Sequence, residues 1–360
     1  MTIPEILNGM KKVRALVVGD ICLDRWCTYD PATSEPSAET GIPRLGIVAS
    51  EVTPGGGGTV AYNLAALGPA KVAVLGVRGD DGFGFELDRA LKERSIDASL
   101  MVEVRQWQTF TYTKLLNSET GIEDQPRADF INTKPLPSEA ELRILANLSA
   151  AIEGFDAVLV ADQAETSAGG VVTPAVRESL IALAAKHPGK TFLADSRRRV
   201  HLFRNVMVKP NHSEAEAACK ALFGSIDFKR LRETLGAKAV FLTHGSKGAL
   251  VLEEGKETWS KPRPVEKPVD ICGAGDSFAA GTALTMAVTR NPVEAASFGN
   301  IVASITVMKK GTGTASPEEI LAATAEAENS DPPRHKDARE GERGGAAVDR
   351  SMEARRKVHP

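Results

Sequence analysis

A glycine-rich turn in the C-terminal part of the chain carries the residues with the clearest chemical potential. The segment VDICGAGDSF places Gly273, Ala274 and Gly275 directly before a helix that we expect to start near Ser277. Glycines allow a tight bend around an anion, and a helix N-terminus supplies unpaired N–H donors. Asp276 lies on the same turn, so the pattern predicts phosphoryl transfer with Asp276 as general base. The alternative is that Asp276 only caps the helix.

A second glycine run, PGGGGTVAYNLAALG at 54–68, leads from an apolar segment into another expected helix. It matches neither the P-loop pattern nor the dinucleotide-binding pattern. Bare backbone amides at Gly55 and Gly56 suit close approach to sugar hydroxyls. A flexible hinge is the alternative for this run taken alone.

Polar residues follow several short apolar runs, namely Asp20, Asp162, Asp195, Asn211 and Thr243. Because ligands bind at the carboxyl ends of parallel strands, these residues are expected to meet at one edge of a sheet. Taken singly, each is equally well explained as a turn former or a helix cap.

The elements that must position these residues alternate along the chain. Apolar runs typical of strands buried on both faces occur at 14–20, 71–77, 157–162, 191–195, 206–211, 238–245 and 248–254. Segments with helical spacing lie between them, for example AVRESLIALAAKH and SEAEAACKALFG. This alternation predicts βαβ units around a mainly parallel sheet.

Two stretches interrupt the alternation and predict a small β appendage, at 21–53 and 98–131. We expect one large domain over 1–325 that includes this appendage. The segment 326–360 is charged, contains Gly and Pro and has few large apolar residues, so it is predicted to be a disordered tail.

Composition limits the classes of partner. The 360 residues are 42% hydrophobic and 25% charged, with a net charge of −3, so no broad attraction to nucleic acid or to an anionic membrane is expected. Four scattered cysteines do not suggest a disulfide framework. Without an apolar run of about 20 residues, no membrane span is expected. These features favour a cytoplasmic protein.

The two glycine turns together resemble the ribokinase family, also called the PfkB carbohydrate kinases. That family has a GG turn before an Ala-rich helix ending in LG, matched here from Gly55 to Gly68, and a DTxGAGD signature, matched from Asp270 to Asp276. The likeness spans about residues 12 to 324. It implies a three-layer α/β/α domain with a β lid, and an ATP-dependent carbohydrate kinase that uses Mg²⁺. A monovalent cation is a further candidate cofactor.

Other residues resemble the heptose 7-phosphate kinase branch of this family. VVGDICLDRW places Asp24 where that branch holds a sugar hydroxyl, and the lid segments TYTKL and PRADF carry Lys114 and Arg127. Arg197 in DSRRR lies near the position of a Lys in that branch. The resemblance therefore implies a phosphorylated sugar as acceptor, with Lys114, Arg127 and Arg197 as candidates to bind its phosphate.

The nucleotide side is also implied by the resemblance. Asn211 and Glu214 match the NxxE element, so Glu214 would act on magnesium indirectly, through water. The remaining positions implied for ATP are Thr243, Gly245 and Gly248 in the turn THGSKG, Asn300 on a helix, and Gly311 in GTGTASPEE.

Two departures from the family pattern concern specificity. Thr59 stands where the family usually has an Asn that contacts the sugar, and Asn63 follows one helical turn later. Both are kept as candidate substrate-binding residues. Ile271 replaces the usual Thr of DTxGAGD, which leaves the monovalent-cation site open.

Other functions remain compatible with the same motifs. The chain could be a fructose, ribose or nucleoside kinase of this family, or a non-catalytic module that senses a sugar or a nucleotide. A homodimer formed through the β lid is also expected, because an isolated small sheet exposes an apolar face and unpaired edges.

Overall fold

The structure is a computed structural model, and it describes residues 1–164, 166 and 170–330. Within these residues the main sheet has eight strands. Their spatial order is β14 (Lys256–Ser260), β13 (Ala249–Glu253), β12 (Val240–Thr243), β11 (Met207–Val208), β10 (Thr191–Ser196), β9 (Ala157–Asp162), β1 (Arg14–Gly19) and β4 (Lys71–Leu75). The strands from β12 to β4 are parallel, while β13 and β14 are antiparallel. The predicted, mainly parallel sheet is confirmed.

The sheet is buried on both faces, which explains the continuous apolar runs in its strands. In β1, Ala15 and Val17 point into one hydrophobic cluster, while Leu16 and Val18 point into the other. Successive side chains of a strand alternate between faces, so a strand covered on both sides has apolar residues at every position.

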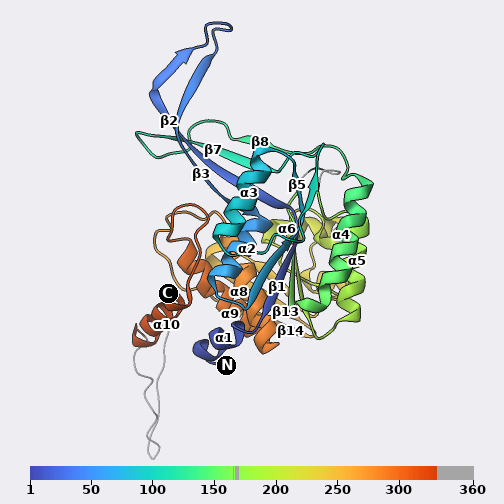
Figure 1. The fold of residues 1–360 in the computed structure, drawn as a ribbon. Helices are drawn as coiled ribbons and strands as arrows, with labels where there is room; N and C mark the ends of the chain where they lie inside the picture. Colours follow the sequence, from blue (N-terminus) through green and yellow to red (C-terminus); the bar gives the residue numbers. More distant parts are fainter. Residues whose placement is uncertain (165, 167–169, 331–360) are drawn as a thin grey trace, which may run out of the picture.

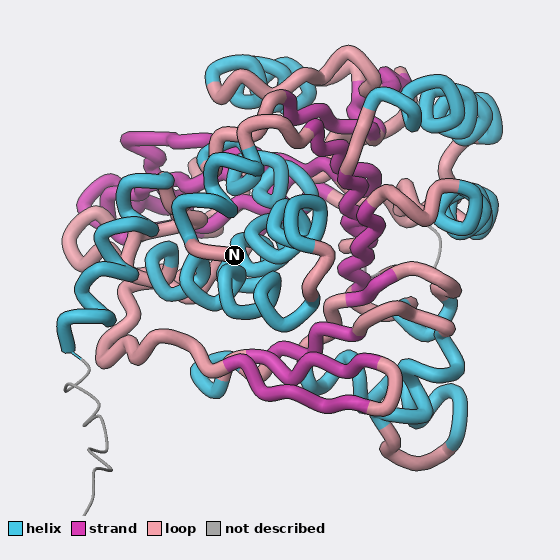
Figure 2. Tube along the Cα trace, turned by 90° about the horizontal axis from the view of Figure 1, so that it is seen from below, coloured by secondary structure: helices cyan, strands magenta, loops and turns pink. Residues whose placement is uncertain are grey.

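Helices cover both faces of the sheet (Figure 2). The helices of one face are α1 (Ile3–Met10), α2 (Gly57–Ala66), α3 (Gly82–Glu93), α8 (Ala274–Thr289), α9 (Pro292–Thr306) and α10 (Pro317–Ser330). Those of the other face are α4 (Ser138–Ala151), α5 (Pro174–Lys186), α6 (His212–Phe223) and α7 (Phe228–Leu235). The result is the three-layer α/β/α arrangement expected from the sequence.

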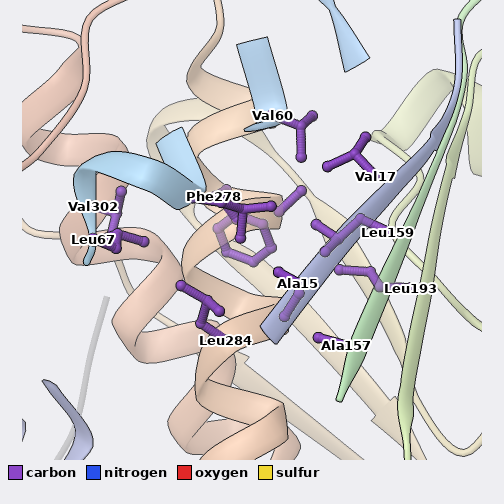
Figure 3. Packing of buried hydrophobic residues seen from close by; sticks show 14 of the residues in the cluster. Ala15, Val17, Val60, Leu67, Ala157, Leu159, Leu193, Phe278, Leu284 and Val302 are labelled. Atoms are coloured by element: carbon purple, nitrogen blue, oxygen red, sulfur yellow. The ribbon is translucent and has the colours of Figure 1, made fainter. Parts of the chain in front are cut away.

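Helix α8 is held in the middle of its layer. Phe278 and Leu284 pack beside Ala15 and Leu159 of the sheet (Figure 3). On the side of α9, a Cβ added at Gly281 would lie 2.9 Å from Val302 Cγ2, so glycine is needed for the two helices to pack this closely. This tight packing fixes the first turn of α8, which carries the glycine-rich segment.

The predicted β lid is a separate four-stranded sheet. Its order is β3 (Pro43–Gly56), β2 (Ile21–Pro36), β7 (Thr111–Asn117) and β8 (Ala128–Phe130). The β2–β3 hairpin projects away from the α/β body (Figure 1). Strand β2 is antiparallel to β3 and parallel to β7, so the lid joins segments that are distant in the sequence.

The lid boundaries differ from the predicted ones at two places. Strand β3 continues beyond residue 53 to Gly56, because it pairs with β2 up to Ile21. Residues Val102–Val104 form β6, which pairs with β5 (Val77–Gly79) in a sheet of its own and not with the lid. Three short 3₁₀ helices complete the elements, η1 (Ile152–Gly154), η2 (Val200–Leu202) and η3 (Gly245–Lys247).

At the C-terminal end, helix α10 continues to Ser330 and so passes the expected domain end at residue 325. The rest of the predicted tail, residues 331–360, lies outside the described residues. Among the helices that the structure describes, none is both long enough and apolar enough to span a membrane.

Candidate active site

A cavity of about 320 Å³ lies between the lid and the carboxyl ends of the parallel strands. The lid contributes Asp24, Trp26, Tyr112, Lys114, Arg127 and Asp129 to its lining, and the α/β body contributes Thr59, Gln163, Arg197, Cys272, Gly273, Asp276 and Thr312. The cavity therefore brings together most of the residues predicted to bind substrate and the predicted base.

Asp276 does not act as a helix cap. Helix α8 begins at Ala274, three residues earlier than predicted, because Gly273 adopts the left-handed conformation (φ 77°) and is itself the N-cap. The first intrahelical hydrogen bond runs from Ser277 N to Gly273 O (2.9 Å). Asp276 lies in the first turn, and its carboxylate lines the cavity. The capping alternative for Asp276 is wrong.

The turn also leaves backbone donors open. Ala274 N–H donates to Ile271 O (3.2 Å), so this group is used within the turn. The N–H groups of Gly273, Gly275 and Asp276 have no acceptor among the described residues, as expected for the first turn of a helix. Three open donors beside a carboxylate form a site suited to an anion.

The surroundings of Asp276 favour its protonated form. Burial is the largest cause, and the nearby carboxylate of Asp195 adds to it, while Lys209 and Arg197 act in the opposite direction. Together they raise the pKa of Asp276 to about 7. A carboxyl group with a pKa near neutral pH is well matched to accept a proton from a hydroxyl group.

The two glycine turns meet at the cavity floor. A Cβ added at Gly273 would lie 3.4 Å from Thr59 Cγ2 and 3.3 Å from Thr312 Cγ2. Gly56 adopts φ 54° at the end of β3, where a Cβ would be 2.9 Å from Asp20 O. Gly55 lies against the sugar-binding candidate Asp24, because a Cβ there would be 2.4 Å from Asp24 Oδ1. Larger residues at 55 would displace the Asp24 carboxylate.

Asp24 and two cations occupy the lid side of the cavity. Burial raises the pKa of Asp24 to about 6, and Lys114 and Arg127 oppose the increase. Arg127 pairs with Asp129 (2.7 Å), and Lys114 lies 3.7 Å from Glu123 and 4.5 Å from the centre of the Trp26 ring. Trp26 was not among the residues predicted from the sequence. Its aromatic ring holds the Lys114 ammonium at the cavity.

The third predicted cation lies at the other end. Arg197 follows β10, donates to Gln163 Oε1 (3.0 Å) and lies 3.9 Å from Glu214 Oε1. Its charge acts to lower the pKa of Asp276, so Arg197 lies at the Asp276 end of the cavity.

Two predicted substrate-binding residues are not in the cavity lining. Asn63 is buried in α2, where its Nδ2 donates to Thr59 O (3.0 Å), so it does not replace the Asn expected at position 59. Gly55 acts through Asp24 and lines no part of the cavity itself. Thr59 does line the cavity, but its hydroxyl donates to Pro54 O (3.1 Å).

The predicted NxxE element is a capping box at the start of α6. Asn211 Oδ1 accepts from Glu214 N (2.9 Å), and Glu214 Oε2 accepts from Asn211 N (2.8 Å). Thr243 bridges to Asn211 at the ends of β12 and β11, with its N–H donated to Pro210 O (3.0 Å). The element therefore has a structural role that leaves Glu214 Oε1 facing Arg197.

The other predicted nucleotide residues lie in turns and at a helix contact. Gly245 (φ 55°) and Gly248 (φ 93°) bend the chain around η3, and a Cβ at Gly248 would lie 2.2 Å from Ser260 O. The Nδ2 group of Asn300 donates to Ser260 O and Oγ (2.9 Å each), which ties α9 to β14. The side-chain NH₂ group of Asn300 is therefore already hydrogen-bonded within the protein.

Gly311 connects the lid with the loop after α9. Its N–H donates to Asp270 Oδ2 (3.1 Å), while Asp270 Oδ1 accepts from Cys272 N (2.8 Å). A Cβ at Gly311 would lie 3.6 Å from Trp26 Cζ2. Asp270 thus joins the glycine turn to this loop. In the part of the chain that the structure describes, no cluster of three or more His, Cys, Asp or Glu side chains could hold a metal ion.

Two further carboxylates at the same edge are fully engaged in structure. Asp20 accepts from the N–H groups of Gln163, Ala164 and Val171 at 2.7 to 2.8 Å. Asp162 accepts from Ser196 Oγ (2.6 Å) and pairs with Arg199. These strand-end residues converge as predicted, but they hold loops together and do not line the cavity.

Comparison with known proteins agrees with this geometry. Residues 47–319 match the pfkB family carbohydrate kinases. A protein named bifunctional protein HldE from Pelobacter propionicus is 30% identical over 332 residues, which are 90% of this chain and 66% of that protein. The HldE protein of Geobacter sulfurreducens is 30% identical over 315 residues, or 86% of this chain and 62% of that protein. The chain thus spans just under two thirds of these relatives.

Solved structures share the fold at lower identity. A ribokinase from Thermotoga maritima aligns with a TM-score of 0.66 and 22% identity over 87% of this chain and 99% of that one. Phosphofructokinase-2 from Escherichia coli, in complex with potassium, aligns with a TM-score of 0.65 and 20% identity over 88% of this chain and 99% of that one. The fold is therefore the ribokinase fold.

Proposed function

Because the chain belongs to the pfkB family of carbohydrate kinases, we propose that it transfers the γ-phosphoryl group of ATP to a hydroxyl of a sugar that already carries a phosphate. The observation that carries this proposal is a single cavity that holds the base candidate Asp276 and three cations, Lys114, Arg127 and Arg197. The specific acceptor we propose is a heptose 7-phosphate.

The acceptor hydroxyl is positioned and deprotonated by two carboxylates. The Asp24 carboxylate has room in the cavity because residue 55 is a glycine. It accepts hydrogen bonds from sugar hydroxyls on the lid side. Asp276 removes the proton from the attacking hydroxyl as its oxygen approaches phosphorus. General bases of this kind contribute roughly 10²- to 10⁴-fold to the rate.

The transferred group binds at the first turn of α8. The open N–H groups of Gly273 and Gly275 can donate to the phosphoryl oxygens, and the positive end of the α8 dipole lies at the same turn. A glycine at 273 is required because its φ of 77° is unfavourable for other residues. Ala274, whose N–H is used within the turn, contributes by keeping that turn closed.

ATP is expected to lie along the ends of β11 and β12, near Asn211, Thr243, Gly245 and Gly248. Magnesium held by nucleotide phosphates keeps several waters and needs only one or two carboxylates from the protein. Glu214 fits this role through water, because the capping box uses Oε2 and leaves Oε1. The bound metal would neutralise phosphate charge, while Glu214 orients its water shell.

A phosphorylated acceptor is favoured by the charges of the lid. Lys114 and Arg127 face the space around Asp24, and each also lies within ion-pair distance of a carboxylate, Glu123 or Asp129. The motifs TYTKL and PRADF that carry these two cations resemble the heptose 7-phosphate kinase branch. Fructose, ribose and nucleoside acceptors remain the alternatives within the family, and a non-catalytic sensing role is disfavoured by the open carboxylate of Asp276.

The lid also supports the proposed homodimer. Three large apolar side chains on or beside β3, Ile42, Ile47 and Val48, are 66%, 47% and 58% exposed. They lie on the projecting hairpin (Figure 1), where a second copy could cover them. Sedimentation of the Ile47→Asp variant should reveal a shift toward monomer if this face is the interface.

The test of the function is an ADP-release screen with ATP, Mg²⁺ and four acceptor classes, namely hexoses, pentoses, heptose phosphates and nucleosides. We expect the highest kcat/KM for a heptose phosphate, and no ADP release above background with the Asp276→Asn variant. A higher kcat/KM for an unphosphorylated sugar or a nucleoside would refute the proposed acceptor. Binding of ATP and sugar without ADP release would favour the sensing role.

A further inference from the structure

Gln163 and Arg197 form a hydrogen-bonded pair at the Asp276 end of the cavity. Both side chains line the cavity, and Arg197 Nε donates to Gln163 Oε1 (3.0 Å). The two residues follow the ends of neighbouring strands, because Asp162 at the end of β9 is paired in parallel register with Ser196 at the end of β10. The fold therefore places the two side chains next to each other.

The backbones of both residues are fixed by the two structural aspartates. Gln163 N–H donates to Asp20 Oδ2 (2.8 Å), and Arg197 N–H donates to Asp162 O (3.1 Å). The side chain of Arg197 is less constrained than its backbone, because 53% of it is exposed. A long, exposed side chain samples several rotamers, so a defined position of the guanidinium requires a partner.

Two side chains lie close enough to hold this guanidinium. Gln163 Oε1 accepts from Nε at 3.0 Å, whereas Glu214 Oε1 lies 3.9 Å from Nη1, which is beyond hydrogen-bond distance. Glu214 also has another partner, because its Oε2 accepts from Asn211 N–H in the capping box. Gln163 is therefore the residue that determines where the guanidinium lies.

The bond to Gln163 uses only the Nε–H group of Arg197. An arginine has five N–H donors, and the four on Nη1 and Nη2 have no acceptor at hydrogen-bond distance among the residues that the structure describes. These two nitrogens form a fork that can bind two oxygens of one phosphate group. A lysine has a single nitrogen, so it could not bond to Gln163 and keep such a fork.

The partner of Arg197 also leaves its charge available. Gln163 is neutral, so it orients the guanidinium without compensating its positive charge. Glu214, at 3.9 Å, is the one carboxylate within ion-pair distance of Arg197 in the described part of the chain. On the lid, by contrast, Arg127 pairs with the Asp129 carboxylate at 2.7 Å. A phosphate therefore meets less competition at Arg197 than at Arg127.

We propose that Gln163 is a positioning residue, which holds Arg197 by Nε so that Nη1 and Nη2 bind a phosphate group at the Asp276 end of the cavity. The inference rests on the proposed kinase function. The phosphate is either that of the acceptor or the group that ATP transfers, and both present the same anionic oxygens to the fork. A guanidinium held in one position binds them without first losing rotamer freedom.

The main experiment compares Gln163→Met with Gln106→Met, using a heptose 7-phosphate and the unphosphorylated heptose as acceptors. Gln106 is the control, because it is exposed and lies outside the cavity lining. If the phosphate is that of the acceptor, Gln163→Met should raise KM about tenfold for the phosphorylated acceptor alone. If it is the transferred group, kcat should fall about tenfold with both acceptors. Changes below about twofold in every constant would overturn the proposal.

A double-mutant cycle separates positioning from direct contact. Arg197→Ala should change the same kinetic constant by roughly 100-fold, because it removes the cation instead of loosening it. If Gln163 acts through Arg197, adding Gln163→Met to Arg197→Ala should alter that constant less than about twofold. A further tenfold loss in the double variant would show that Gln163 acts independently of Arg197, and this result would overturn the proposal.

The melting temperature distinguishes positioning from a structural role. The bond between Gln163 and Arg197 is exposed to solvent, so Gln163→Met should change the melting temperature little. Asp162→Asn, which breaks the buried pair with Arg199, gives the scale of a structural loss. An equally large fall in melting temperature for Gln163→Met would assign this residue to the fold and overturn the proposal.

A measurement on the guanidinium itself does not require catalysis. The Nε–H signal of Arg197 in an NMR spectrum is assigned by its loss in Arg197→Lys. Its order parameter should be above about 0.6 in the wild type and should fall below that value in Gln163→Met. If the wild type phosphorylates no acceptor, the proposed function fails, and this measurement still decides whether Gln163 holds Arg197. An order parameter that Gln163→Met leaves unchanged would overturn the proposal.

Discussion

Two pairs of aspartates lie near the same edge of the sheet but differ in how many hydrogen bonds their carboxylates accept. In the first pair, Asp20 accepts three backbone N–H groups, and Asp162 binds Arg199 and Ser196. In the second pair, Asp24 and Asp276 accept no hydrogen bond from any residue that the structure describes, and both line the cavity. The first pair holds loops in place, and the second is available to a ligand.

A raised pKa alone does not separate the two pairs. Burial raises the pKa of Asp20 to about 6, the same value as for Asp24. What differs is whether the carboxylate oxygens are already saturated with donors and whether they face open space. Hydrogen-bond saturation therefore separates the structural carboxylates from the proposed working carboxylates, Asp24 and Asp276, better than their pKa values do.

The largest expected effect comes from converting a working carboxylate to an amide. Asp276→Asn should lower kcat by about two orders of magnitude or more, because the amide cannot take the hydroxyl proton. Steady-state ADP release checks the rate, and calorimetry checks that ATP binding is retained. Asp227→Asn is the control, since Asp227 caps α7 away from the cavity and Asn caps equally well. Near-normal turnover of Asp276→Asn would remove Asp276 from its proposed role.

The same change in the first pair should instead affect folding. Asp162→Asn leaves the guanidinium of Arg199 without its carboxylate in a largely buried setting, and should lower the free energy of unfolding by about 3 kcal/mol. Denaturant unfolding measures this loss. Asp156→Asn, which breaks the exposed ion pair with Arg14, should have a much smaller effect. Equal stability of the Asp162 and Asp156 variants would contradict the division into structural and working carboxylates.

Stability and activity should depend on pH in opposite ways. Asp276 has a pKa of about 7 in the folded protein against an ordinary value of 3.8, so folding favours its protonated form. The resulting stability is fully present below pH 3.8 and is lost as pH rises through about 7. Activity should rise over the upper part of this range, because the base must be ionised.

The measurement is the melting temperature of the wild type and of Asp276→Asn between pH 5 and 8. We expect the variant to be more stable than the wild type at pH 8 and the difference to shrink toward pH 5. The acidic limb of kcat/KM for the wild type should have an apparent pKa of about 7. A melting-temperature difference that is independent of pH would show that burial does not raise the pKa of this carboxyl group.

The sequence predicted the sheet well because burial on both faces leaves a strong signal in it. All seven expected strands are present, whereas β14, with the polar sequence KETWS, was missed because it lies at the edge and is mostly exposed. The start of α8 was predicted three residues too late. The left-handed conformation of Gly273 lets the helix begin at Ala274, and the side chains that surround this glycine, Thr59 and Thr312, come from distant parts of the sequence.

The site was predictable where chemistry is concentrated in a short motif, and less so where it depends on distant pairing. Asp276 and its turn form such a motif. Lys209 was missed because lysine is usually exposed, and its burial depends on Asp195, which lies on another strand. Asn63 was misplaced for a related reason, since one helical turn separates it from Thr59 but its side chain bonds within α2. The spacing of a motif predicts which residue types lie near one another in the chain, but it does not predict where their side chains point.

The smallest expected effect concerns the cations that surround Asp24. Arg127→Ala should raise KM for a phosphorylated acceptor by roughly tenfold or more, because a charge-assisted hydrogen bond is lost, and should leave KM for an unphosphorylated sugar nearly unchanged. Arg105→Ala is the control, because Arg105 is 91% exposed and lies outside the cavity lining. Arg127 already pairs with Asp129, so the phosphate must compete with an existing partner. Equal losses on both acceptors would mean that this ion pair only orders the lid, and would move Arg127 to the structural side of the comparison.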